Sequence, residues 1–262
     1  MLAPALIATA VLFGGALAGA LWSSLQPNPA GGGVSLEAWQ AVLGDPSFLD
    51  AALFTLQTSA LATLLAAILA ILAARVLRDR GSGLRTMFSL PVPVPHLIVA
   101  ILALLWLAPG GLADRLLGPL PVSLTGDRAG LGIVVVYVYK EAPFLALLLL
   151  ASWGPRLRER EEAAALLGAS AWQRLRWVVW PGLRTPLVVG SLIVAAFAVG
   201  SFEVPLTVGP TYPPTLSVSA LEAARSADLA GQAQASATLL IAAAASIALA
   251  LGAARAARSD VG

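Results

Sequence analysis

Two oppositely charged residues stand side by side in one of the most apolar stretches of this sequence. Lys140 and Glu141 interrupt the run VVVYVYKEAPFLALLLL, which belongs to a stretch long enough to cross a lipid bilayer. Charged groups at membrane depth are costly unless they pair, bind carbonyl groups or face water, so they often mark a pathway for ions or solutes. Neighbouring residues on a helix diverge by about 100°, so we expect these two side chains to have different partners.

A third acidic residue, Glu203, lies in VGSFEVPLTVG near the end of another apolar stretch, two residues before Pro205. It is expected either to line a pathway or to cap a helix that breaks near the membrane surface. A carboxylate in a pathway can replace the water that an ammonium group loses, so Glu141 and Glu203 are candidate waypoints for a cationic solute. Alternatively, Lys140, Glu141 and Glu203 only hold helices or subunits together, and the sequence leaves both interpretations open.

The sequence lacks the residues on which most catalytic sites depend. It has no cysteine and a single histidine, His96, which excludes thiolate sites and two-histidine metal motifs. The only lysine, Lys140, follows Tyr139 and so cannot belong to the Gly-Lys pair of an ATP-binding Walker A loop. His96 follows the run PVPVP, where carbonyls freed by proline or the start of a helix are expected to satisfy its ring. We predict no catalytic residue, metal or cofactor in this chain.

The composition is that of an integral membrane protein. Hydrophobic residues make up 58% of the chain and charged residues 11%, a balance typical of proteins whose solvent is lipid. Six runs are long enough to span a bilayer, at residues 4–25, 50–74, 88–108, 131–152, 187–206 and 233–254. None of them alternates with a period of two, so we predict an all-α membrane protein with six transmembrane helices in one domain, residues 1–262. The first run follows no basic residue, so we interpret it as a spanning helix rather than a cleaved signal.

The arginines predict how the chain is oriented. One set of loops and the tail hold most of them: Arg75, Arg78, Arg80, Arg85, Arg156, Arg158, Arg160, Arg174, Arg176, Arg184, Arg255 and Arg258. The opposite loops hold Arg115, Arg128 and Arg225. The positive-inside rule then places both termini, the loop between runs two and three, and the loop between runs four and five in the cytoplasm. The net charge of +2 is too small and too scattered to suggest a nucleic-acid partner.

The outer loop at residues 26–48 begins with proline and glycine and then predicts a short amphipathic helix around 36–43. The cytoplasmic loop at about 154–186 is more unusual, because it contains the charged and alanine-rich stretch EEAAALLGAS. Alanine and leucine favour a helix here, and we expect Gly168 to end it.

Charge and amphipathicity complete the prediction for this cytoplasmic loop. Glu159, Glu161 and Glu162 are expected at the start of its first helix, where the helix dipole favours acidic groups. A second, amphipathic helix at 171–180 is expected to stop at Pro181. Such a pair of helices either lies on the inner leaflet or docks into a partner, and the glutamates favour a partner because the leaflet is itself anionic.

The loop resembles the EAA loop of the membrane-spanning subunits of bacterial ATP-binding-cassette importers. That pattern has Glu-Ala-Ala, a glycine four residues after the last alanine, and a later Ile-x-Leu-Pro. The matching residues here are Glu162, Ala163, Ala164, Gly168, Val178, Val179, Trp180 and Pro181. Six spans with this loop between the fourth and fifth are the architecture of the family, so the resemblance covers most of the chain.

The resemblance implies a coupling helix that seats in a cleft of a cytoplasmic ATPase. The residues that it assigns to coupling are Glu161, Glu162, Ala163, Ala164, Gly168, Ala169 and Pro181. It also implies an ATPase dimer that binds ATP and Mg, a second permease subunit, and an extracytoplasmic solute-binding protein, all in a bacterial inner membrane. We expect the second permease to be a different chain rather than a second copy of this one.

Within that family the chain is most similar to permeases of the polyamine type. These carry stretches like Lys-Glu-Ala-Pro-Phe at 140–144 and Phe-Glu-Val-Pro at 202–205, and a proline-rich outer loop like Tyr212-Pro213-Pro214. A polyamine-like solute is therefore expected, with alternating access as the mechanism. An ion-coupled secondary transporter or channel is the alternative that the intramembrane charges alone would permit.

Overall fold

The chain folds into helices in the computed structural model, which describes residues 3–26, 33–118, 123–228 and 230–258 and contains no strand in those ranges. Six helices in the described ranges are long and apolar enough to cross a membrane, which confirms the predicted all-α class and the number of spans. The long helices are α1 (Ala3–Ser24), α3 (Pro46–Leu77), α7 (Leu131–Ser152), α10 (Trp180–Gly200) and α13 (Gly231–Arg258). The third span, His96–Leu117, begins with the 12-residue helix α5 (His96–Leu107). The shorter ones are α2 (Glu37–Gly44), α4 (Ser82–Ser89), α6 (Leu112–Leu117), α8 (Pro155–Leu166), α9 (Ala171–Arg174), the π-helical segment η1 (Leu175–Val179), α11 (Glu203–Val208) and α12 (Leu216–Arg225).

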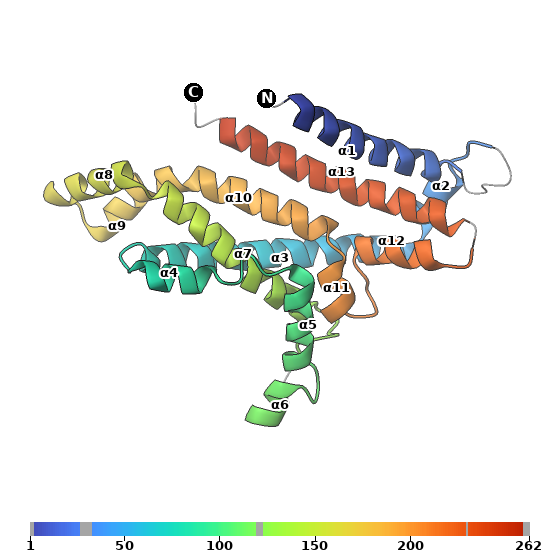
Figure 1. Cartoon of the computed structure of the whole chain (residues 1–262), viewed down its shortest axis with the longest axis horizontal. Coiled ribbons are helices and arrows are strands. Elements are labelled where there is room, and N and C mark those ends of the chain that lie inside the picture. Colours follow the sequence, from blue (N-terminus) through green and yellow to red (C-terminus); the bar gives the residue numbers. More distant parts are fainter. Residues whose placement is uncertain (1–2, 27–32, 119–122, 229, 259–262) are drawn as a thin grey trace.

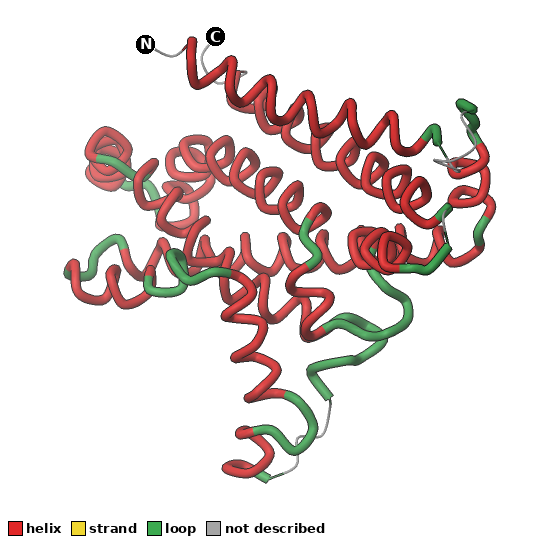
Figure 2. The backbone as a smooth tube through the Cα atoms, turned by 45° about the vertical axis from the view of Figure 1, so that its right-hand side comes forward, coloured by secondary structure: helices red, strands yellow, loops and turns green. Residues whose placement is uncertain are grey.

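Helix α7 lies at the centre of the bundle. It packs along α3 and against α10, whereas α1 lies at the edge beside α13. Helices α5 and α6 project away from the other long helices (Figures 1 and 2). Helices α1 and α13 each have one end near a chain terminus. These two ends lie at the same end of the bundle as α4, α8 and α9 (Figure 1).

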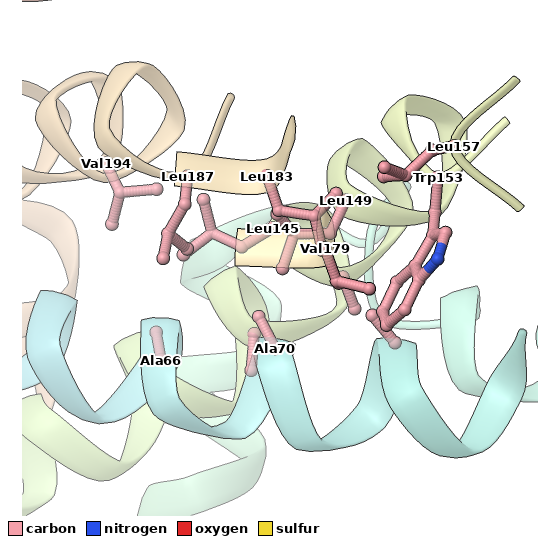
Figure 3. Close-up of a cluster of buried hydrophobic side chains, with 13 residues drawn as sticks. Ala66, Ala70, Leu145, Leu149, Trp153, Leu157, Val179, Leu183, Leu187 and Val194 are labelled. Atoms are coloured by element: carbon pink, nitrogen blue, oxygen red, sulfur yellow. The ribbon is translucent and has the colours of Figure 1, made fainter. Parts of the chain in front are cut away.

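A hydrophobic core joins α3, α7, α8 and α10 near that end. Ala66 and Ala70 of α3 face leucines of α7 and α10 (Figure 3). Small side chains on one helix let the backbones approach closely, which is how helices gain packing energy in a membrane that offers no hydrophobic driving force between them. Trp153 and Leu157 extend the core towards α8, so the first turn of α8 is anchored to the spans.

Gly190 marks the closest approach between α10 and α7, and its replacement by alanine tests this packing. A methyl group there would lie 2.6 Å from Leu148 Cδ2 and 2.7 Å from Leu145 Cδ2, so both leucines would have to move. We expect Gly190→Ala to lower the free energy of unfolding by about 1–3 kcal/mol, measured by denaturation in detergent. Gly200→Ala on the same helix is the matched control, because its methyl group would meet only Ser246 Oγ at 3.4 Å. Equal stability of the two variants would contradict this packing.

The third span begins later than the sequence predicted. The apolar run was expected to form a helix over 88–108, but helix α4 ends at Ser89 and α5 starts at His96, with turns between them. The reason is that Pro91, Pro93 and Pro95 remove three amide donors, so the backbone forms turns there instead of a continuous helix.

The amphipathic helix at 171–180 was predicted to stop at Pro181, but it continues into the fifth span. A continuous helix runs from Ala171 to Gly200, through the π-helical turn η1. In that turn the Trp180 amide donates to the Leu175 carbonyl, five residues back, and Pro181 follows in the first turn of α10. The changed hydrogen-bond spacing accommodates a residue without an amide donor. The span also ends at Gly200 rather than at 206, because the chain breaks before α11.

The amphipathic helix predicted around 36–43 is present as α2. The proline- and glycine-rich start of the same loop, 27–32, lies outside the described residues. Helix α3 begins at Pro46, earlier than predicted, with the Asp45 side chain accepting a hydrogen bond from the Ser47 amide at 2.8 Å. This cap satisfies one of the amide donors that the first turn of a helix leaves free.

Candidate functional site

The glycine turn after α8 has the geometry that its sequence predicted. Gly168 has a positive φ of 85°, a conformation that glycine adopts without steric cost. Its amide donates to the Ala165 carbonyl, and the Ala169 amide donates to the Ala164 carbonyl, both at 3.0 Å. These two bonds form a Schellman motif, which satisfies carbonyls at the end of a helix.

The next helix starts immediately after this turn. Ser170 and Gln173 form a capping box, in which each side chain accepts a hydrogen bond from the other residue's amide. The turn is therefore held on both sides by local hydrogen bonds. Apolar side chains before the turn and in the following helix face solvent: Leu166 is 90% exposed, Leu167 89% and Trp177 70%.

Large exposed apolar side chains of this kind are typical of a surface that a partner covers. A hollow of about 400 Å³ lies beside them, bounded by residues that include Ala164, Gly168 and Trp177. Ala163 and Glu162 are also exposed on α8, and Pro181 is exposed at the start of α10.

The sequence predicted Glu159, Glu161 and Glu162 at the start of the helix, but in the structure they lie further along α8. Helix α8 begins at Pro155, so its first turn contains no acidic residue. The predicted start was wrong because proline is favoured in the first turn of a helix and Trp153 holds the preceding residues in the core. Glu161 instead faces the end of α3, where its carboxylate accepts a hydrogen bond from Arg78 at 2.7 Å.

The Lys140 side chain is buried and ends among three backbone carbonyls. Its ammonium group donates to the carbonyls of Pro91, Val92 and Val94 at 2.7, 3.0 and 2.5 Å. Prolines at 93 and 95 leave carbonyls of this turn without the amide partners of a helix. The carbonyls that we expected to satisfy His96 therefore bind Lys140, because its long side chain reaches them from α7 whereas the histidine starts the next helix.

Glu141 has a different partner, as the helix geometry predicted. Its carboxylate lies 2.7 Å from His96 Nε2, at the start of α5. The imidazole also lies against Phe197 of α10, with the ring centroids 4.5 Å apart. Tyr137 packs edge-on to the same phenylalanine, and its buried hydroxyl lies beside the Ser201 side chain. Three spans thus meet in one polar and aromatic cluster.

Glu203 lies where the fifth span breaks. Helix α10 ends at Gly200, and Glu203 is the first residue of α11, half buried. Within the described residues its carboxylate makes no hydrogen bond or ion pair. Helix α11 packs against α5 and α7, which carry His96 and Glu141. The two carboxylates therefore approach the same cluster, whereas the Lys140 ammonium points towards the proline turn.

Sequence reasoning did not identify Tyr137 and Phe197 as members of this cluster. Both lie in apolar runs, and nothing in their neighbourhood distinguishes them from aromatic residues that only fill a core. The only signal for the proline carbonyls was the alternation of proline in PVPVP, which we assigned to the wrong side chain. Among the described residues, no group of three or more His, Cys, Asp or Glu is arranged to hold a metal ion.

The sequence pattern of one protein family matches most of this chain. The family is described as "Binding-protein-dependent transport system inner membrane component", and the match covers residues 62–258. The chain belongs to this family. The matched residues include Lys140, Glu141, the turn at Gly168 and the break before Glu203. Family membership and the six apolar helices confirm that this chain is a multi-pass inner-membrane permease component. The family consists of transport subunits rather than enzymes.

Curated members of the family differ in what their names say they carry. The inner membrane ABC transporter permease protein YnjC of Escherichia coli is 31% identical over 188 residues, which are 71% of this chain and 36% of that protein. The trehalose transport system permease protein SugA of Mycobacterium tuberculosis is 31% identical over 184 residues, 66% of this chain and 60% of that protein. The sulfate transport system permease protein CysW of Escherichia coli is 29% identical over 164 residues, 61% of this chain and 56% of that protein. The matches thus span between 36% and 60% of these relatives.

Solved structures of transporters share the fold. One chain of a bacterial alginate ABC transporter, in complex with a periplasmic protein bound to an alginate pentasaccharide, superposes with a TM-score of 0.77. It is 20% identical, and the superposition covers 97% of this chain and 91% of that one. A second alginate transporter structure gives a TM-score of 0.75 at 22% identity. At these identities the likeness establishes the fold alone.

Proposed function

We propose that this chain is the permease subunit of an ATP-driven importer, which moves a small solute delivered by an extracytoplasmic binding protein. The observation that carries the proposal is the exposed glycine turn at Gly168, on a chain whose family is described by its dependence on a binding protein. Residues 1–262 act as one membrane domain, with both termini and the loop at 154–186 in the cytoplasm. The shared end of α1, α13 and α8 supports this orientation.

The cytoplasmic loop passes the energy of ATP to the spans. Part of α8 and the turn at Gly168 seat in a cleft of a separate ATPase dimer, which binds ATP and Mg. The residues that meet the ATPase are Glu162, Ala163, Ala164, Gly168 and Ala169, with Pro181 at the start of the following span, while Glu161 lies beside them on the face of α8 towards α3. The exposed leucines and the free side chain of Glu162 support a docked partner rather than a helix lying in an anionic leaflet. A second permease subunit, as a different chain, completes the pathway.

The solute passes near Glu141 and Glu203 by alternating access. The Lys140 ammonium group points away from this cluster, because three carbonyls of the proline turn hold it. Glu141 lies against His96, which leaves the carboxylate of Glu203 to meet a cation such as a polyamine. The names of relatives do not select this class, since trehalose is neutral and sulfate is an anion.

Removing the charge of Glu203 tests the proposed solute class. We expect Glu203→Gln to lower the uptake of a cationic solute about tenfold, because a charge-assisted contact contributes about 1.5–3 kcal/mol. Uptake is measured with radiolabelled spermidine in proteoliposomes that contain the whole transporter and its binding protein. Glu222→Gln is the matched control, because Glu222 is an exposed glutamate on the neighbouring helix α12. Equal spermidine uptake by both variants would remove Glu203 from the pathway.

Affinity purification from the native host tests the function itself. We expect the solubilised chain to bring down an ATPase and a second permease, with a solute-binding protein identified by mass spectrometry. That binding protein can then be titrated with candidate solutes. Recovery of the chain alone, together with reconstituted transport that needs only an ion gradient, would instead support a secondary transporter or channel.

A further inference from the structure

The inner end of α3 is held by three arginines and one glutamate. The Arg78 guanidinium donates to Glu161 of α8 at 2.7 Å and to Asp79 at 3.0 Å. Burial disfavours its charged form, but these hydrogen bonds prevail and raise the pKa of Arg78. The same guanidinium lies 4.5 Å above the Trp153 ring at the end of α7, within the range of a cation–π contact.

Two further arginines cap the carbonyls that α3 leaves free at its end. Arg85, just after the start of α4, donates to the carbonyls of Leu77 and Arg78. Arg158 of α8 donates to the Arg78 carbonyl at 2.7 Å. Basic groups are favoured at this end of a helix by its dipole and by the unpaired carbonyls. Helix α8 therefore forms hydrogen bonds with the end of α3 through both Glu161 and Arg158.

These side chains provide the polar link between α8 and α3, in addition to the apolar core that Leu157 shares with α3. The backbone of α8 lies nearest to η1 and α9, and a hollow of about 210 Å³ lies between α8 and the end of α3, bounded by residues that include Arg78 and Glu161. The Arg78 and Glu161 side chains are only 23% and 18% exposed. Such a partly buried pair is screened from salt and solvent more than a surface pair is.

Helix α3 connects this inner contact to the opposite end of the bundle. It has 32 residues, and at its other end Thr55 Oγ1 accepts a hydrogen bond from the Leu216 amide of α12 at 2.9 Å. Asp50 accepts a hydrogen bond from the Tyr212 hydroxyl in the loop before α12. A displacement of the inner end of α3 is thus transmitted, through one continuous helix, to the outer loops.

We propose that Arg78 and Glu161 form a latch that makes α3 follow α8 when the ATPase moves the coupling segment. Glu161 is the positioning residue of the pair, since it acts through Arg78, whereas its neighbour Glu162 stays free for the ATPase. The latch rests on the proposed function and adds the route by which the spans respond. It couples α8 both to α7, through Trp153, and to the outer loops, through α3.

The test compares single and reciprocal substitutions in the complete transporter. Glu161→Gln keeps the shape of the side chain and removes its charge, so we expect the number of solute molecules imported per ATP to fall about tenfold. The reciprocal variant, Arg78→Glu with Glu161→Arg, is expected to recover at least a third of that ratio, because it restores an ion pair across the same contact. Glu159→Gln, an exposed glutamate on the same helix, is expected to leave the ratio unchanged.

Three results would overturn the latch. An unchanged ratio in Glu161→Gln would show that α3 does not depend on the pair. If the reciprocal variant imports as little solute per ATP as Glu161→Gln, the ion pair is not what couples α3 to α8. Reduced co-purification of the ATPase with Glu161→Gln would assign the residue to assembly instead. If the wild-type chain brings down no ATPase, the proposed function fails first and the latch with it, so the two failures are distinguishable.

Discussion

Replacing Lys140 with methionine is expected to lower the free energy of unfolding of the membrane domain by about 3 kcal/mol. Methionine fills a similar volume, but it leaves the carbonyls of Val92 and Val94 without the lysine donor and the Pro91 carbonyl with only the Val94 amide. No water reaches this depth freely, so the carbonyls lose their hydrogen bonds rather than exchange them. Denaturation in detergent, followed by circular dichroism, measures the loss.

Two comparisons make the Lys140 result specific. Tyr139→Phe changes the adjacent residue, which points about 100° away and is exposed, and should leave stability unchanged. Lys140→Arg keeps the charge. The planar guanidinium of arginine cannot direct three donors from one nitrogen at these converging carbonyls, so we expect partial destabilisation. A methionine variant as stable as the wild type would show that the proline turn does not need the lysine.

Replacing Gly168 with valine is expected to abolish ATP-dependent uptake in the reconstituted transporter. A residue with a side chain costs about 1–2 kcal/mol in the left-handed conformation of Gly168, and a β-branched residue costs more. No atom lies within 4 Å of where its Cβ would be, so only the backbone of the turn is strained. The chain would relieve this strain by changing the turn that presents the coupling segment. Uptake and solute-stimulated ATP hydrolysis measure the effect.

A graded series separates the backbone of the turn from the size of the side chain. Asparagine tolerates a positive φ better than alanine, and alanine better than valine, so uptake should decline in that order. Gly83→Ala is the control, because Gly83 lies in helix α4, also without neighbours near its Cβ. The denaturation midpoint should change far less than uptake, because the turn is exposed and can relax locally. Uptake by the Gly168→Val variant at the wild-type rate would remove the turn from the coupling mechanism.

Features fixed by local chemistry could be predicted from the sequence. The six spans follow from the length of apolar runs, because lipid leaves the helix as the simplest way to satisfy a backbone. The turn at Gly168 follows from alanines before it and from a glycine that can adopt a positive φ. The divergence of Lys140 and Glu141 follows from helix geometry alone.

Predictions that relied on one residue type failed where other contacts competed. Pro181 was expected to stop a helix, but the π-helical turn at Leu175–Val179 changes the hydrogen-bond spacing before it. The glutamates of α8 were placed at a helix start from charge alone, although Pro155 begins that helix earlier. In both cases a neighbouring hydrogen bond or packing contact outweighed the propensity.

The sequence by itself determined the number of spanning helices, the loops in which the arginines gather, and the family that the loop at 154–186 resembles. These properties depend on composition and on residues within a few positions of one another. Only the tertiary structure decided that Lys140 binds the proline turn, that His96 meets Glu141, and that Arg78 joins α3 to α8. Those partners are 46–49, 45 and 83 residues apart in the chain. Which of several possible partners a buried charge takes depends on how the helices pack, and no local pattern records that choice.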